Sequence, residues 1–377
     1  MFVMVLAFAI STAVALALVR LAHSGYLPSL DVDTSGPQKF HVKPVPRIGG
    51  VGILLGVLAA SGFLLGLHPG AGAAALTLVL CGMPAFVVGL IEDLSKNVSP
   101  ARRLLATAVS AALAFWLLDA AITRSDIPGL DWLIGFGAGS AVVTVFAVAG
   151  IANSVNIIDG FNGLASMCVV LMLASIAYVG FQVDDPLIGL LALAGIGAVL
   201  GFFVWNFPAG LIFLGDGGAY FLGFFVAELS ILLLVRNDEV SPLFPLLVCI
   251  YPVFETVFSI YRRRFLKAVP PSMPDGIHLH SLIYRRVVRW AVGSRNAKAL
   301  TRRNSMTSPY LWLLCMCSVV PAMLFWRNSA VLGVLLLLFA FGYVGLYWRI
   351  VRFKSPRWLV YRRRHDTLAA GSDNRGT

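Results

Sequence analysis

Acidic residues in apolar surroundings are the first sign of chemistry in this sequence. Glu92 and Asp93 are adjacent in "GLIEDL", and Asp216 lies between glycines in "LIFLGDGGAYFLG". Neighbouring helix residues point about 100° apart, so Glu92 and Asp93 cannot both face lipid cheaply. Paired acids act as oxygen ligands for Mg²⁺ or as a general base, and a pair that only ends a membrane span is the plain alternative. For Asp216, both a helix cap and a place beside a bound anion fit the flanking glycines.

A second polar stretch, "NSVNIIDGFNGL", has polar side chains at every third position: Asn153, Asn156, Asp159 and Asn162. A three-residue step turns an ideal helix by about 300°, so these side chains cannot share one narrow stripe. A polar lining that ends in a broken helix fits better, and Gly160 can supply the break. Asp159 is then placed to bind a ligand or a metal, and a capped helix terminus is the plain alternative.

Histidines and basic residues offer partners for phosphate. His278 and His280 occur in "PDGIHLHSLIYRR", and two residues apart they share a face on an extended segment but not on a helix. Imidazole, guanidinium and backbone amide groups bind phosphate oxygens. The polar clusters that accompany these histidines contain Asp and no Cys, which favours Mg²⁺ and phosphate chemistry over a transition-metal site.

A stiff basic segment, "HVKPVPRIGGVGI", contains His41, Lys43 and Arg47. Its prolines restrict the backbone, so these side chains are expected to form a basic rim around a floor of carboxylates. Acids for Mg²⁺ and bases for phosphate oxygens fit phosphoryl transfer, which depends mainly on positioning and on neutralising oxygen charge.

Membrane helices must position these residues. Of 377 residues, 59% are hydrophobic and only 12% are charged, against about 25% charged in soluble domains. Runs of about 20 apolar residues, long enough to cross the hydrocarbon core, recur eleven times and predict an all-α polytopic membrane protein. The predicted spans are 2–20, 49–67, 71–91, 104–118, 132–151, 164–181, 187–205, 218–235, 243–260, 309–326 and 330–348. The five cysteines fall within these spans, so no disulfide or zinc framework is expected.

The distribution of charge predicts the topology. One alternating set of connections contains 26 Lys and Arg, and the other contains three: Arg124, Arg236 and Arg327. The positive-inside rule places the richer set in the cytoplasm, with the N-terminus outside and the C-terminus inside. The net charge of +11 therefore indicates attraction to lipid headgroups and not to nucleic acid.

The polar clusters all fall on the predicted cytoplasmic side. We expect one transmembrane catalytic domain, 1–348, and a basic tail, 349–377. The expected active-site loops are 39–50, 92–103, 152–163, 206–217 and 261–308. A transporter of nucleotide or lipid-linked sugars without chemistry is the alternative, but it predicts polar residues on both sides of the midplane, and the outer connections are plain.

In their order, these clusters resemble the polyprenyl-phosphate N-acetylhexosamine-1-phosphate transferase family (glycosyltransferase family 4). The patterns "NSVNIIDGFNGLA" and "NFPAGLIFLGDGGAYFLG" carry a likeness that extends over about residues 40–290. The branch it suits initiates O-antigen and enterobacterial common antigen. The resemblance implies attack of undecaprenyl phosphate on the β-phosphate of a UDP-N-acetylhexosamine, by default UDP-N-acetylglucosamine, giving undecaprenyl-diphospho-sugar and UMP.

The same resemblance implies a multi-pass protein of the bacterial inner membrane with its active site on the cytoplasmic face. It implies a requirement for Mg²⁺, with Mn²⁺ as the alternative ion. A homodimer is an open expectation, as is the choice between direct attack and a covalent intermediate.

Roles for single residues follow from the resemblance, position by position. Asp216 matches a metal ligand, Asp159 and Asn156 match residues near the metal and nucleotide, and Phe213 matches an aromatic that stacks on uracil. Asp93 matches an acid proposed to deprotonate or orient the lipid phosphate. The other expected site residues are Glu92, His278 and His280 for catalysis, and Lys43, Arg47, Arg103, Asn162, Asn206 and Arg285 for substrate binding.

Four positions leave questions open. Glu92 and Asn162 stand where many relatives have Asp, and Ser281 replaces a histidine, which leaves the identity of the donor sugar open. Glu255 falls where relatives carry an acid, and a pairing with Arg262 or Arg263 is an equal alternative.

Overall fold

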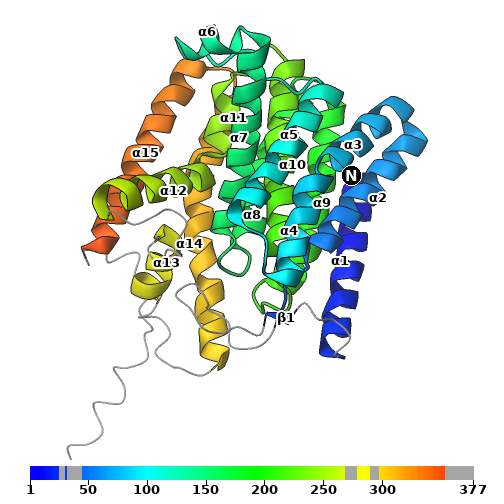
Figure 1. Ribbon diagram of the computed structural model, residues 1–377, viewed down its shortest axis with the longest axis vertical. Helices are drawn as coiled ribbons and strands as arrows, with labels where there is room; N and C mark the ends of the chain where they lie inside the picture. Colours follow the sequence, from blue (N-terminus) through cyan, green and yellow to red (C-terminus); the bar gives the residue numbers. More distant parts are fainter. Residues whose placement is uncertain (25–29, 32–44, 268–277, 289–296, 353–377) are drawn as a thin grey trace, which may run out of the picture.

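The computed structural model describes residues 1–24, 30–31, 45–267, 278–288 and 297–352. Figure 1 shows a bundle whose long helices run roughly along one axis. The only strands in this part of the chain are β1 (Leu30–Asp31) and β2 (Val45–Pro46), which pair antiparallel. The expectation of an all-α polytopic architecture is therefore confirmed, apart from this two-residue pairing.

Fifteen α-helices follow one another along the described residues. Their bounds are α1 (Phe2–His23), α2 (Gly50–Leu67), α3 (Pro69–Cys81), α4 (Met83–Ser95), α5 (Pro100–Leu117), α6 (Leu130–Ile134), α7 (Gly137–Ile158), α8 (Leu164–Gln182), α9 (Pro186–Asn206), α10 (Gly215–Arg236), α11 (Leu243–Val248), α12 (Ile250–Tyr261), α13 (Leu279–Leu282), α14 (Ala297–Leu324) and α15 (Ser329–Val351). Two π-helical turns, Arg262–Lys267 and Ile283–Val287, follow α12 and α13.

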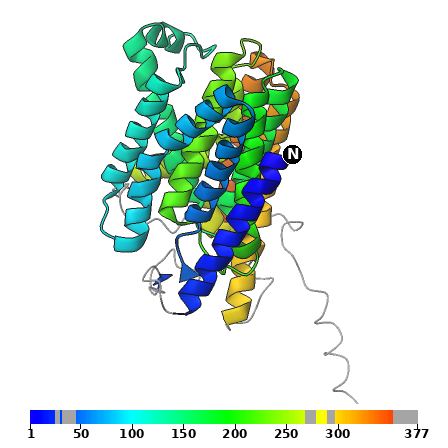
Figure 2. The ribbon, with the colours of Figure 1, turned by 90° about the vertical axis from the view of Figure 1, so that its right-hand side faces the viewer.

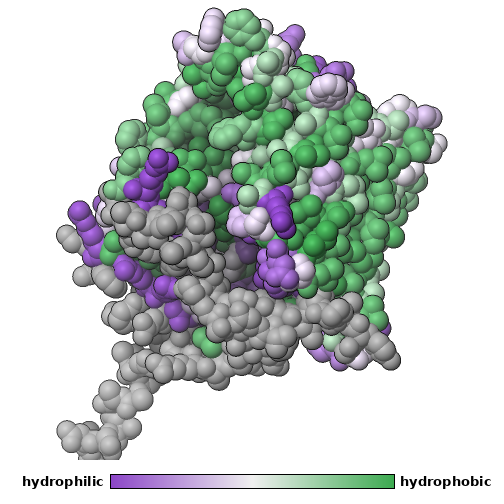
Figure 3. Space-filling view, viewed as in Figure 1, coloured by the Kyte–Doolittle hydropathy of each residue, from purple (hydrophilic) through white to green (hydrophobic). Residues whose placement is uncertain are grey.

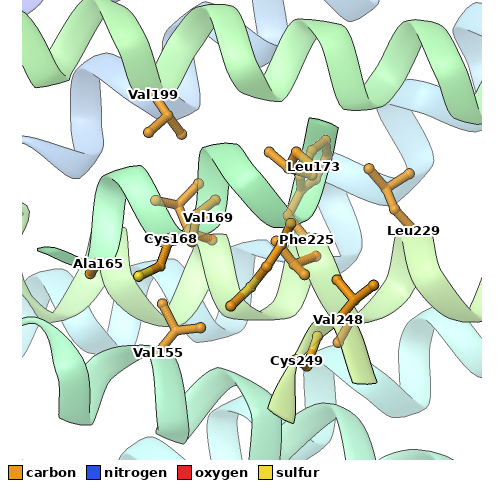
Figure 4. Packing of buried hydrophobic residues seen from close by; sticks show 14 of the residues in the cluster. Val155, Ala165, Cys168, Val169, Leu173, Val199, Phe225, Leu229, Val248 and Cys249 are labelled. Atoms are coloured by element: carbon orange, nitrogen blue, oxygen red, sulfur yellow. The ribbon is translucent and has the colours of Figure 1, made fainter. Parts of the chain in front are cut away.

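Helix α10 is the centre of the bundle. Almost all of its side chains are buried, and it contacts α2, α4, α5, α7, α8 and α9. Apolar side chains of α7, α8, α9 and α10 pack together around Cys168, Leu173 and Phe225, as Figure 4 shows. Helix α1 runs along the outside of the bundle against α2 (Figure 2).

The outer surface is apolar as well as the core. Large side chains such as Trp116, Phe146 and Phe341 are exposed on their helices. Figure 3 shows apolar side chains over the middle of this face, with hydrophilic ones at its upper edge and towards its lower end. An apolar surface of this extent is expected of helices that face lipid.

Within the described residues, eight helices are long and apolar enough to cross a membrane, and the bent pair α3 and α4 makes a ninth if it is one span. The predicted count of eleven is not confirmed. The run 104–118 lies in α5, whose first turn contains Arg102 and Arg103, and these charges lower its hydropathy. The run 243–260 is divided between α11 and α12, with Cys249 between them.

Hydrogen bonds tie several distant segments together at one end of the bundle. Gly49 N and Gly50 N donate to the carbonyl groups of Phe213 and Leu214, and Phe213 N donates to Pro46 O. These bonds join the start of α2 to the start of α10. The same end carries the last turns of α4 and α7, together with α13 and the first turns of α14 (Figure 1).

Candidate active site

A polar cavity of about 350 Å³ lies where these segments meet. Five separate parts of the chain supply its lining: the segment before α2, the end of α7, the stretch from α9 into α10, the residues around α13, and α14. Its polar and charged lining residues are Arg47, Asn156, Asp159, Asn162, Asn206, Asp216, His278, His280, Ser281 and Asn304, and Phe213 lines it too. Four of the five predicted loops, all but 92–103, thus contribute to the lining of one cavity.

The first turn of α10 is capped by an acid from another helix. Asp93, at the end of α4, accepts hydrogen bonds from Asp216 N and from Gly217 N, each at 2.9 Å. Asp93 is only 3% exposed, and α10 has no side-chain cap from its own N-terminal residues. The interpretation of Asp216 as a helix cap is therefore wrong, because Asp93 performs that task. A carboxylate is favoured there by the dipole of α10.

Asp216 itself faces two arginines. Its Oδ2 accepts from Nη1 of Arg103, at the start of α5, and its Oδ1 lies 3.5 Å from Nη2 of Arg47. Nε of Arg47 also lies 3.7 Å from Oδ1 of Asp93. Of the three residues predicted to form a basic rim, Arg47 does lie beside two carboxylates, and Arg103 joins it from α5. Two of these side chains, Arg103 and Asp93, do not line the cavity themselves.

Glycines bring the backbones of α2, α4 and α10 into contact. Gly215 has a φ of +78°, and a Cβ there would overlap Arg47 O and Oδ2 of Asp93. A Cβ on Gly89 would lie 2.6 Å from the Cα of Gly217. These glycines therefore serve helix packing and the turn into α10, whereas the sequence had suggested backbone room for an anion.

The end of α7 breaks as expected. The helix stops at Ile158, the chain turns at Asp159 and Gly160, and Gly163 adopts a φ of +73°. Asp159 is half-buried and lines the cavity. Burial has the largest effect on the pKa of its carboxyl and raises it to about 7, Arg47 lowers it, and Asp216 and Asp93 raise it further.

Two asparagines hold this turn in place. Asn206 accepts from Gly163 N at 2.6 Å and donates to Ile212 O at 2.8 Å. Asn162 donates its backbone N–H to Oδ1 of Asn304 at 2.8 Å. The side chain of Asn206 and the backbone N–H of Asn162 thus join separate segments, and the expected contacts of both residues with substrate stay a prediction.

Helix α14 contributes residues that the sequence did not single out. Asn304 lines the cavity, Ser305 contacts the Asn162 amide, and Ser308 donates to Asn162 O at 2.6 Å. The polar run "RRNSMTSP" before a predicted span was the available signal. This run resembles the polar residues that ordinarily precede a membrane span, because Ser and Asn are common at helix starts.

The two histidines enter the cavity side by side. Their rings stack with centroids 5.0 Å apart and an interplanar angle of 9°. Phe161 meets the His280 ring edge-on, at 5.6 Å between centroids. The short spacing in sequence therefore does put both imidazoles on one face, although His280 lies in the short helix α13.

Two further predicted site residues, Glu92 and Arg285, do not line the cavity. Oε2 of Glu92 accepts from Val98 N at 2.7 Å, which closes the turn after α4. Arg285 is exposed in the π-helical turn after α13 and does not line the cavity. Lys43 lies outside the described residues, as do His41 and most of the predicted tail.

The side chains of the cavity can be compared with known metal-binding sites. No three His, Cys, Asp or Glu side chains in the described ranges lie close enough together to ligate one metal. Mg²⁺, however, is usually held by one or two carboxylates together with substrate phosphates and water. Asp159 and Asp216, which both line the cavity, are a donor set of that kind.

Several known proteins are similar in sequence to this chain. The model of glycosyl transferase family 4 matches residues 75–234. A probable undecaprenyl-phosphate N-acetylglucosaminyl 1-phosphate transferase from Bacillus subtilis is 31% identical over 66% of this chain and 68% of that protein. An undecaprenyl-phosphate alpha-N-acetylglucosaminyl 1-phosphate transferase from Thermotoga maritima is 30% identical over 69% and 75%. A phospho-N-acetylmuramoyl-pentapeptide-transferase from Geobacillus kaustophilus is 29% identical over 52% and 64%.

Proposed function

Because the chain belongs to glycosyl transferase family 4, we propose that it transfers N-acetylhexosamine-1-phosphate from a UDP-N-acetylhexosamine to undecaprenyl phosphate. A phosphate oxygen of the lipid forms a bond to the sugar-bearing phosphorus. The bond from that phosphorus to the bridging oxygen breaks, and UMP leaves. The product, undecaprenyl-diphospho-sugar, would initiate a lipid-linked surface glycan such as O-antigen. UDP-N-acetylglucosamine is the proposed donor.

The observation that carries this proposal is the mixed charge of one cavity at the end of a membrane bundle. Asp159, Asp216, Arg47, His278 and His280 all line it. Basic groups can bind phosphate oxygens, with Arg as a bidentate donor. Their convergence on one end of the bundle suits a reaction between a soluble nucleotide sugar and a lipid headgroup. We place this end at the cytoplasmic face of a bacterial inner membrane.

Asp159 and Asp216 are the residues that would hold Mg²⁺. The ion, when bound, would neutralise charge on the diphosphate of the donor. Arg47 and Arg103 would add positive charge beside it, because both face Asp216. Phe213 offers an aromatic surface for uracil on the same lining. Mn²⁺ is the alternative ion.

The lipid phosphate needs little help from a base. A phosphate monoester has a second pKa near 6, so most of it is already dianionic at pH 7. Both carboxylate oxygens of Asp93 accept backbone N–H groups. We therefore assign to Asp93 the placement of the first turn of α10, and through it of Asp216, and we favour direct attack by the lipid phosphate.

The test is an assay of the purified chain in detergent with undecaprenyl phosphate, Mg²⁺ and a panel of UDP-N-acetylhexosamines. UMP release that requires both the lipid and one of the donors is the expected result. Folded protein that binds a UDP-sugar but releases no UMP with any donor would contradict transfer. That outcome would favour the transporter alternative.

A further inference from the structure

Glu255 is a buried acid on α12 that takes no direct part in the reaction just described. It is 1% exposed, and burial of a carboxylate is costly unless the group is paired and hydrogen-bonded. Its Oε1 accepts from Leu279 N at 2.7 Å, and its Oε2 accepts from the hydroxyl of Tyr343 at 2.8 Å. These bonds join α12 to α13 and α15.

The same carboxylate faces both cavity histidines. Oε1 of Glu255 lies 3.4 Å from Nδ1 of His278 and 3.6 Å from Nδ1 of His280, within the distance of an ion pair. Two stacked imidazoles therefore turn the same ring nitrogen towards one oxygen. These separations are those of an electrostatic contact and not of a short hydrogen bond. An ionised carboxylate attracts hydrogens and only accepts hydrogen bonds, so it favours a hydrogen on Nδ1 of each ring.

The opposite edge of each ring is thereby turned away from α12. For His280, a Cβ placed on Gly160 would lie 3.6 Å from Nε2, so Nε2 lies beside the Asp159 turn. Both histidines line the cavity. With Nδ1 of each ring turned towards Glu255, Nε2 lies on the opposite edge, and for His280 that edge borders the cavity residue Gly160.

We propose that Glu255 is a positioning residue, which holds His278 and His280 with Nδ1 towards α12 so that their Nε2 atoms meet the diphosphate oxygens of the donor. The role in turnover rests on the proposed function, whereas the orientation of the rings rests on the contacts alone. The sequence left open a pairing of Glu255 with Arg262 or Arg263. The network with Tyr343, Leu279 and the two histidines gives the carboxylate a different task, while Arg262 donates to the hydroxyl of Tyr347.

Glu255→Gln is the informative variant for turnover. Its amide oxygen can still accept from Leu279 N, and its NH₂ can donate to the Tyr343 oxygen, so the fold is expected to survive. Loss of the negative charge weakens the attraction of this oxygen for both Nδ1 atoms, although the oxygen itself remains. Loss of a carboxylate that orients a metal-bound histidine typically costs about 10- to 100-fold in metal affinity or activity, and by analogy kcat/KM for the UDP-sugar should fall by about that factor. Tyr343→Phe, which keeps the carboxylate, should cost less.

A double-mutant cycle separates positioning from an independent effect. If Glu255 acts through the histidines, Glu255→Gln should lose little further activity in a His278→Asn, His280→Asn background, because coupled residues are non-additive. Losses that multiply in full would overturn the proposal. So would a fall in the thermal midpoint of Glu255→Gln as large as the one caused by Glu255→Ala.

The orientation can be measured without turnover. Histidine ¹⁵N spectra of the full chain in detergent, assigned with the two His→Asn variants, should show a hydrogen on Nδ1 of both residues, and Glu255→Gln should change these signals. Unprotonated Nδ1 in the wild type would overturn the proposal. If no donor gives UMP, the proposed function fails, yet these spectra still decide what Glu255 does.

Discussion

At the scale of single residues, the cavity divides its acids into two kinds. Asp93 is fully used by the backbone of α10, since each of its carboxylate oxygens accepts one N–H. Asp216, two residues into the same helix, turns towards Arg103 and Arg47 and lines the cavity. Asp93 therefore stabilises the structure of the site, and Asp216 lies where it can contact a bound substrate or metal. This division predicts different consequences when each is changed to its amide.

Asp93→Asn should destabilise the protein. Asn has one acceptor oxygen, so its NH₂ would face one of the N–H groups of α10 and leave a buried donor without a partner. Such a loss costs about 1–3 kcal/mol, visible as a lower thermal midpoint in detergent. Glu92→Gln is the matched control, because its amide oxygen can still accept from Val98 N. Equal midpoints for the two variants would refute the capping role.

Asp216→Asn should separate binding from turnover. The amide keeps the volume but frees Arg47 and Arg103 for the donor diphosphate, so UDP-sugar binding should weaken little. Turnover should fall by at least about 100-fold, as when a group that stabilises transition-state charge is removed. Titration calorimetry and UMP release measure the two effects. Glu239→Gln, at an exposed ion pair with Arg327, is the control, and a fully active Asp216→Asn would exclude a role in catalysis.

At the scale of elements, the site depends on how closely three helices approach. Gly50 of α2 and Gly89 of α4 meet Gly218 and Gly217 of α10 backbone to backbone. This approach brings Asp93 within reach of the first turn of α10. Contacts between small residues of this kind are typical of packed membrane helices.

Gly89→Ala should therefore lower stability and activity together. The three atoms nearest to a Cβ at this position are backbone atoms of Asp216 and Gly217, and overpacking of this kind typically costs about 1–3 kcal/mol. Gly342→Ala in α15, where a Cβ would meet nothing within 4 Å, should be neutral. Thermal unfolding and UMP release of both variants test this, and a Gly89→Ala protein as stable and active as Gly342→Ala would contradict it.

The sequence predicted the convergence of the polar clusters but not the details that hold them. The alternation of apolar runs puts all these clusters on one side of the membrane. The sequence alone therefore predicted that Asp159, Asp216, His278 and His280 lie together. The capping of α10 by Asp93 could not, because it depends on a helix crossing between residues more than a hundred positions apart. The hydrogen bond between Asn304 and Asn162 could not be predicted either, because Asn162 lies in a loop far from Asn304 in the sequence.

At the scale of the whole molecule, the arrangement predicts a topology. The cavity lies at the end of the bundle that contains Arg47, Arg103 and the segment around α13, and the positive-inside rule assigns that end to the cytoplasm. A reporter fused after α15 should therefore be cytoplasmic. A reporter fused at the connection between α14 and α15 should be on the opposite side, and both reporters on one side would contradict the topology.

In the proposed reaction, this cavity joins a sugar phosphate to a lipid phosphate. Mass spectrometry of the lipid product, combined with quantification of the nucleotide from the same reaction, measures both products at once. We predict one undecaprenyl-diphospho-N-acetylhexosamine for each UMP released by the wild type, and neither product above background for Asp216→Asn. UMP formed without a lipid-linked sugar phosphate, or a lipid product accompanied by UDP, would contradict this reaction.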